Sequence, residues 1–245
     1  MYIILFFIFG LLIGSFLNVV IIRIPEGKTI IYGRSSCPNC GYVLKAYDLV
    51  PVASFLLLQG KCRKCKMRIS RQYPFVELVT GILFAFAYHK VGFNIRLLES
   101  LLFVSLSIAV TFTDIKYLRI PNKIVLFGIL TVIPFLIYKG ELLNASLGFL
   151  VGGGILFLLA IITRGGMGGG DIKLAAMQGL YLGVSNMVLT LFLAFISSGF
   201  ISLFLILIRI RSRKDMIPFG PFLAIAGLVS YFYGSEILTW YFARF

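Results

Sequence analysis

Long apolar runs alternate with short polar segments along almost the whole chain. Most of the runs are about 20 residues long, which is the length that an α-helix needs to cross the hydrocarbon core of a bilayer. The pattern predicts eight transmembrane helices, at 2–22, 75–91, 97–113, 123–138, 142–162, 172–184, 186–208 and 219–243. We therefore expect an all-α polytopic membrane protein.

Residues 23–74 form the one long polar segment, and they divide the chain into three parts. We expect a first transmembrane helix at 1–22, a small polar domain at 23–74 and a larger transmembrane domain at 75–245. A domain of about 50 residues buries too little apolar surface for a large hydrophobic core. A bound metal would therefore help to stabilise its fold.

The positive charge of the chain lies mostly on one side of the predicted helices. The net charge is +14, and 19 of the 23 Lys and Arg residues lie in or beside the connections 23–74, 114–122, 163–171 and 209–218. Because basic residues mark the cytoplasmic side, the N-terminus is expected outside and the polar segment inside. Basic clusters beside membrane helices also attract acidic lipids, and we expect no nucleic-acid partner.

All four cysteines lie in the polar segment, as two CxxC pairs that contain Cys37 with Cys40 and Cys62 with Cys65. Two such turns present four thiolates to one tetrahedral Zn²⁺, and four protein ligands leave no position for a reacting water. A structural zinc site is expected on these grounds. Two disulfides and four unliganded thiols are the alternatives, although the cytoplasm disfavours the first.

Two aspartates stand at predicted helix ends on this same inner side. Asp114 follows the third helix, and Asp171 comes after the glycine-rich run 165–170. Carboxylates at membrane depth are costly, so such groups usually mark functional sites. Asp114 has an ordinary alternative as the partner of Lys116 or Arg119. The ordinary alternative for Asp171 is the N-cap of the sixth helix.

Capping and ion pairing do not explain why both acids lie on one side, beside so many glycines. Two carboxylates can share one proton, so that one activates a water and the other protonates the leaving group. Gly168 and Gly170 would let an extended substrate backbone approach the acids. Helix dipoles favour the anion at Asp171, which begins a helix, and the shared proton on Asp114, which ends one.

An ordered set of motifs resembles the bacterial type IV prepilin peptidases, a family of GxGD intramembrane aspartyl proteases. The motifs are GSFLNVV at 14–20, the two CxxC pairs, QYPFVE at 72–77, Asp114 with IPN at 120–122, GGGD at 168–171 and PFGPF at 218–222. The resemblance implies that Asp114 and Asp171 cleave a basic leader from prepilins or pseudopilins, just after a glycine.

The resemblance also implies methylation of the new N-terminus by S-adenosylmethionine, zinc in a cytoplasmic domain and a location in the bacterial inner membrane. Glu77, just inside the second helix, is a candidate contact for a cationic part of the substrate or cofactor, or a partner of Arg71.

Three other functions stay open on the sequence. One is a peptidase for preflagellin-like leaders without methyltransferase activity. Another is a proton- or cation-coupled transporter, whose acids should lie near the bilayer midplane. The last is a membrane scaffold that is stabilised by a bound metal and catalyses no reaction.

Overall fold

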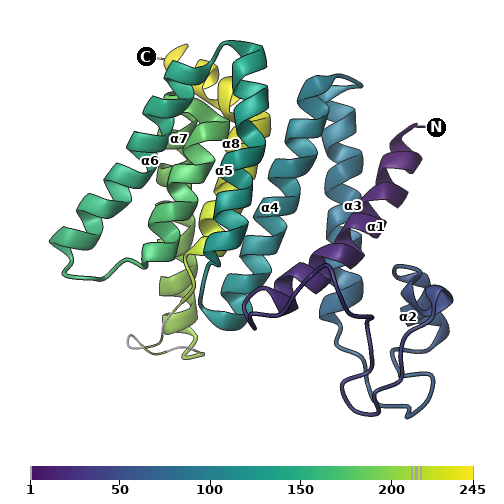
Figure 1. The fold of residues 1–245 in the computed structure, drawn as a ribbon. Coiled ribbons are helices and arrows are strands. Elements are labelled where there is room, and N and C mark those ends of the chain that lie inside the picture. Colours follow the sequence, from purple (N-terminus) through teal and green to yellow (C-terminus); the bar gives the residue numbers. More distant parts are fainter. Residues whose placement is uncertain (1, 211, 213–214, 216, 245) are drawn as a thin grey trace. The chain divides into compact units, whose positions relative to one another are not determined.

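The computed structural model describes residues 2–210, 212, 215 and 217–244, and the regular structure in them is helical. The basic connection at 209–218 therefore lies partly outside the described residues. Seven of the helices are long and apolar enough to cross a membrane (Figure 1). These are α1 (Tyr2–Arg23), α3 (Gln72–Val91), α4 (Ile95–Tyr117), α5 (Asn122–Lys139), α6 (Leu142–Ile162), α7 (Gly169–Leu207) and α8 (Gly220–Phe242). The predicted all-α polytopic fold is confirmed.

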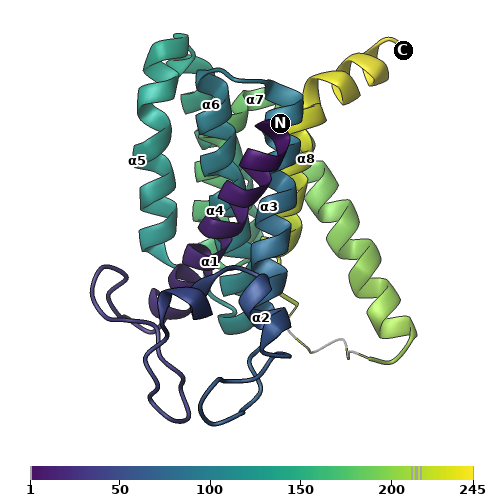
Figure 2. The ribbon, with the colours of Figure 1, turned by 90° about the vertical axis from the view of Figure 1, so that its right-hand side faces the viewer.

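Helix α7 explains why seven long helices are found where the sequence predicts eight. Its 39 residues include Gly183, whose φ of +69° and ψ of −177° are not helical. A β-carbon on Gly152 would contact both Ala175 and Met187. Along one straight helix these two residues would be about 18 Å apart, so the chain turns back at Gly183. The two halves of α7 are the sixth and seventh predicted helices, and Figure 2 shows the second half in light green.

Large apolar side chains are exposed along the long helices. The exposed fractions of Ile4, Ile137 and Phe200 are 64%, 62% and 72%. Soluble proteins rarely expose apolar patches of this extent, whereas lipid tails surround such side chains at no cost. The chain is therefore a multi-pass membrane protein.

The chain divides into two compact units, Met1–Ala109 and Val110–Phe245, and α4 runs through the boundary between them. The three domains expected from the sequence, with boundaries after residues 22 and 74, stay a prediction. In the first unit α1 packs closely on α3. A β-carbon on Gly10 or Gly14 would lie 2.7 Å from a backbone Cα of α3, so only glycine allows this approach.

The second unit is organised around α7, which packs against both α6 and α8. β-Carbons on Gly148 and Gly152 of α6 would contact the backbone oxygens of Gly179 and Ala175 in α7. On the other side, the buried Gln178 donates a hydrogen bond of 3.2 Å to the backbone oxygen of Leu223 in α8. These contacts fix the first half of α7, which carries Asp171, relative to the helices around it.

Candidate functional site

Asp114 lies inside the last turn of α4, because the helix continues to Tyr117, four residues beyond the predicted end at 113. Its side chain is buried, and its Oδ2 atom accepts a hydrogen bond of 3.0 Å from the backbone N–H of Gly220. Neither Lys116 nor Arg119, which are both described, forms an ion pair with it. The ordinary alternative for Asp114 is therefore wrong.

The donor to Asp114 comes from the first residue of α8. The first N–H groups of a helix have no partner within the helix, so they are available to an acceptor outside it. A β-carbon on Gly220 would lie 2.6 Å from Oδ2 of Asp114, so only glycine fits there. The sequence indicated Gly220 only as part of a motif, without a role, because the contact joins residues that are 106 positions apart.

Asp171 is the third residue of α7, since this helix begins at Gly169 and its N-cap residue is Gly168. Interpreting Asp171 itself as the N-cap is therefore wrong. Gly168 instead makes room for the acid, because a β-carbon on Gly168 would lie 3.0 Å from Oδ2 of Asp171.

Ile120 links the segments that carry the two acids. β-Carbons on Gly170 and Gly220 would lie 3.1 Å and 3.2 Å from its buried side chain. Gly220 donates to Asp114 and Gly170 directly precedes Asp171, so Ile120 packs against a residue beside each acid. Gly170 thus has a packing role with Ile120. The predicted contact of Gly168 and Gly170 with substrate stays a prediction.

Both acids stand in terminal turns of their helices, one in the last turn of α4 and the other in the first turn of α7. A transporter with coupled acids would be expected to hold them near the middle of the membrane. The placement of Asp114 and Asp171 therefore favours chemistry at a membrane interface over transport.

The four cysteines form a second cluster of chemical groups, in the first unit. Their Sγ atoms all lie within 4.8 Å of one another, and all four are free thiols. The Sγ atoms of Cys37 and Cys65 are 3.7 Å apart, and those of Cys40 and Cys62 are 4.0 Å apart. A disulfide bond is about 2.0 Å long, so the disulfide alternative is wrong. The cluster can hold one metal ion.

The two CxxC turns have the same backbone structure. The N–H of Cys37 donates to the oxygen of Tyr42, and the N–H of Cys62 donates to the oxygen of Met67 in the same way. The backbone N–H of Met67 lowers the pKa of Cys65 to about 6, which favours the thiolate that binds a metal. The N–H of Tyr42 also lowers the pKa of Cys40, but burial and the neighbouring thiols raise it to about 11.

Asp48 joins the two CxxC turns, and sequence reasoning missed it. Its Oδ1 accepts a hydrogen bond of 2.8 Å from Nε of Arg63, and its Oδ2 accepts from Lys45 N–H and the Tyr42 hydroxyl. Burial alone would raise the pKa of Asp48, but the hydrogen bonds from Arg63 and Lys45 hold it below its ordinary value. An acid between two CxxC pairs in a strongly basic segment was the signal available in the sequence.

Glu77 is buried in α3 and holds a turn of the polar segment. Its Oε2 accepts a hydrogen bond of 2.8 Å from the backbone N–H of Val52. Val52 has φ +60°, which is strained for a β-branched residue, so the hydrogen bond stabilises an unfavourable turn. Arg71, which is described, forms no ion pair with Glu77. The predicted contact of Glu77 with a cationic ligand stays a prediction.

Comparison with known proteins gives matches over nearly the whole chain. Residues 8–91 match the Bacterial Peptidase A24 N-terminal domain, and residues 101–203 match the Type IV leader peptidase family. No solved structure matches.

Several relatives are named prepilin leader peptidase/N-methyltransferase. The protein of that name from Bacillus subtilis is 39% identical, and the match covers 96% of each chain. The protein of that name from Aeromonas hydrophila is 33% identical, and the match covers 100% of this chain and 95% of that protein. The one from Pseudomonas aeruginosa is 31% identical, and the match covers 95% of this chain and 90% of that protein. These matches confirm the resemblance found in the motifs, and the protein belongs to the type IV leader peptidase family.

Proposed function

We propose that this protein cleaves the leader from type IV prepilin-like proteins with Asp114 and Asp171, and that it methylates the new N-terminus. Its relatives carry both activities in their names. The observation that carries the proposal is that Ile120 packs both against Gly170, which precedes Asp171 in α7, and against Gly220, which donates to Asp114 in α4.

In the proposed reaction, one carboxylate takes a proton from the attacking water and the other protonates the departing amine. Gly220 holds Oδ2 of Asp114, which leaves its Oδ1 atom for the water or the shared proton. Two carboxyl groups that share one proton titrate as a pair. The dipoles of α4 and α7 favour the proton on Asp114 and the anion on Asp171, whereas the N–H of Gly220 at the start of α8 favours the anion on Asp114, so we assign the proton to the pair.

We place the protein in the bacterial inner membrane, with its N-terminus outside and the cysteine domain in the cytoplasm. A basic leader would then wait in the cytoplasm while the apolar helix of the prepilin stays in the membrane. The scissile bond would lie at the inner interface, near both acids, with Gly168 and Gly170 beside the substrate backbone. Acidic membrane lipids are expected partners, and nucleic acids are not.

An assay with purified protein in detergent tests both activities. The protein is mixed with a synthetic prepilin and methyl-labelled S-adenosylmethionine, and the products are separated by mass. We expect release of the leader and a label on the new N-terminus. Leader release without the label would favour the preflagellin-type alternative, and a prepilin that stays intact would contradict the proposal.

For the cysteine cluster we propose structural Zn²⁺. Zinc–sulfur bonds of about 2.3 Å in a tetrahedron separate the sulfurs by about 3.8 Å, which matches the separations of 3.7 Å and 4.0 Å. Zinc would fix the fold of the domain and leave the hydrolysis to the acids. The methyl group would come from S-adenosylmethionine, and Glu77 is our candidate to contact its cationic part.

Serine at both Cys37 and Cys62 is expected to remove zinc from the protein. Structural zinc supplies about 10–16 kcal/mol of apparent binding energy to small domains, so the segment 23–74 should also lose its protection from proteases. Metal analysis and limited proteolysis measure the two effects. Tyr32→Ser, at an exposed position of the same segment, should change neither. One zinc per chain in the double variant would contradict the proposed ligand set.

A further inference from the structure

The buried amide of Gln178 joins the first half of α7 to α8. Gln178 is fully buried, and its Nε2 donates a hydrogen bond of 3.2 Å to the backbone oxygen of Leu223. The amide lies directly over Gly227, because a β-carbon on Gly227 would be 2.5 Å from Nε2. Gln178 comes seven residues after Asp171, which is about two turns of helix, so both side chains lie on the same side of α7.

Two contacts indicate that α8 runs parallel to the first half of α7. Near the start of both helices, β-carbons on Gly170 and Gly220 would both contact Ile120. Farther along, Gln178 lies over Gly227. The second contact comes eight residues after the first on α7 and seven residues after it on α8. The contact of Gln178 therefore fixes how far α8 is advanced along α7, and with it the position of the first turn of α8.

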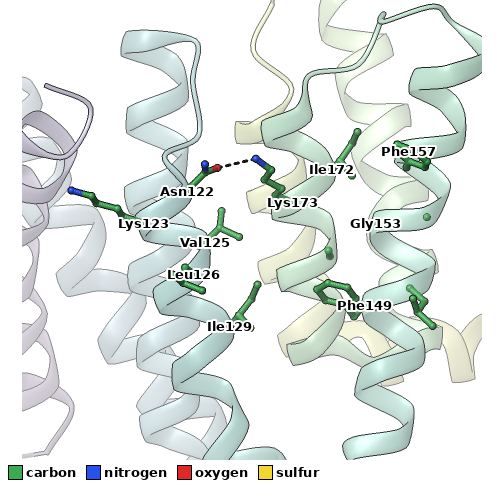
Figure 3. Close-up of a pocket in the computed structure, with 13 residues that line it drawn as sticks. Asn122, Lys123, Val125, Leu126, Ile129, Phe149, Gly153, Phe157, Ile172 and Lys173 are labelled. Carbon is green, nitrogen blue, oxygen red and sulfur yellow. Dashed lines mark hydrogen bonds between the residues drawn. The ribbon is translucent and has the colours of Figure 1, made fainter. Parts of the chain in front are cut away.

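Other contacts hold the first half of α7 on the sides away from α8. Gly148 and Gly152 of α6 pack so closely that their β-carbons would contact backbone oxygens of α7. In the first turn of α7, the ammonium group of Lys173 donates a hydrogen bond of 3.0 Å to Oδ1 of Asn122 at the start of α5, as the dashed line in Figure 3 shows. Loss of the Gln178 contact would therefore move the start of α8 and leave α7 in place.

The fold would be at least as stable without the amide of Gln178. Its Oε1 atom is buried and has no hydrogen-bond partner among the residues that the structure describes. A buried amide oxygen without a partner costs more free energy than one hydrogen bond between membrane helices contributes. An apolar side chain of the same length would avoid this cost. The hydrogen bond to α8 is therefore better explained by where it places α8 than by its effect on stability.

We propose that Gln178 is a positioning residue for the pair of acids. The proposal rests on the proposed function, in which Asp114 and Asp171 act on one water. Gln178 sets the position of the first turn of α8, so that the N–H of Gly220 holds Oδ2 of Asp114 in place for the reaction. Its amide lies about 10 Å along α7 from Asp171, so it acts through α8 and does not contact the reacting groups.

Methionine at Gln178 tests this role, because it has the length of glutamine but no amide group. With purified protein and a synthetic prepilin, we expect kcat to fall about tenfold with little change in KM. A small displacement of Asp114 slows the chemistry, whereas the binding of the prepilin does not depend on it. The midpoint of thermal unfolding should stay the same or rise, because the variant removes the buried oxygen that has no partner among the described residues.

The matched control is Thr190→Val in the second half of α7. Thr190 is also fully buried, but its Oγ1 donates a hydrogen bond of 2.7 Å to the backbone oxygen of Asn186 in the same helix. This variant should keep the kcat of the wild type. An unchanged kcat in Gln178→Met would overturn the positioning role alone, and so would a lower kcat together with a lower unfolding midpoint. A prepilin that the wild type leaves intact would overturn the proposed function as well.

A double variant tests whether Gln178 acts through Gly220 and Asp114. A β-carbon on Gly220 already displaces the carboxylate of Asp114, so Gln178→Met should add little to the effect of Gly220→Ala. We expect the kcat of the double variant to agree with that of Gly220→Ala within about twofold. Losses that multiply would mean that the two residues act independently, which contradicts the proposal.

Discussion

Asparagine at either Asp114 or Asp171 is expected to lower kcat for prepilin cleavage by at least about 10³-fold. Asparagine has nearly the same shape as aspartate, but it can neither take a proton from water nor give one to the leaving amine. Asp114→Asn keeps a side-chain oxygen that can accept from the N–H of Gly220, so the position of the side chain is preserved. Leader release from a synthetic prepilin by the purified variants measures the effect.

Groups that act as one unit show strongly non-additive losses, so the double variant is expected to be no slower than the slower single variant. Glu141→Gln removes an exposed acid at the N-cap of α6, away from the dyad, and should leave cleavage unchanged. Thermal unfolding of each purified variant separates loss of chemistry from loss of fold. Full turnover by either single variant would remove the dyad from the mechanism.

The sequence predicts features that depend on local pattern. Apolar runs of membrane length predicted all the long helices, and they placed a break at 185, two residues after the observed turn at Gly183. The two CxxC pairs predicted the thiol cluster, since the spacing within each pair fixes two ligands on one turn. Asp114 and Asp171 stood out because acids are rare beside such runs.

The helix ends differ from the prediction for a physical reason. Hydropathy locates the edge of the hydrocarbon, whereas the hydrogen bonds of a helix continue into the interface. Helix α4 therefore extends past 113, and α7 begins three residues before 172. As a result both acids lie inside helices, where neighbouring turns hold their side chains, rather than in connecting loops.

Contacts between distant segments were beyond sequence reasoning. The hydrogen bond from Gly220 to Asp114 joins α8 to α4, and the hydrogen bond from Val52 to Glu77 joins the polar segment to α3. Each uses a backbone N–H, which every residue except proline carries, so nothing in the sequence distinguishes the donor. The sequence marked Gly220 only as the central residue of the motif PFGPF.

Alanine at Gly220 is expected to lower kcat for cleavage by about 10²-fold, because a catalytic group displaced by about 1 Å loses a factor of that size. The added β-carbon would lie 2.6 Å from Oδ2 and 3.1 Å from Cγ of Asp114, so the carboxylate must move. Gly220 does not have a left-handed backbone conformation, so alanine adds no backbone strain there and the effect comes from the contact alone.

The kcat of purified Gly220→Ala for a synthetic prepilin checks this expectation, with Gly199→Ala as the matched control in open space. Zinc content should be the same in both variants, since the cysteine cluster lies in the other unit of the chain. Wild-type kcat in Gly220→Ala would mean that Asp114 needs neither its hydrogen bond nor its observed position. The arrangement of α4 and α8 would then not be the one that supports hydrolysis.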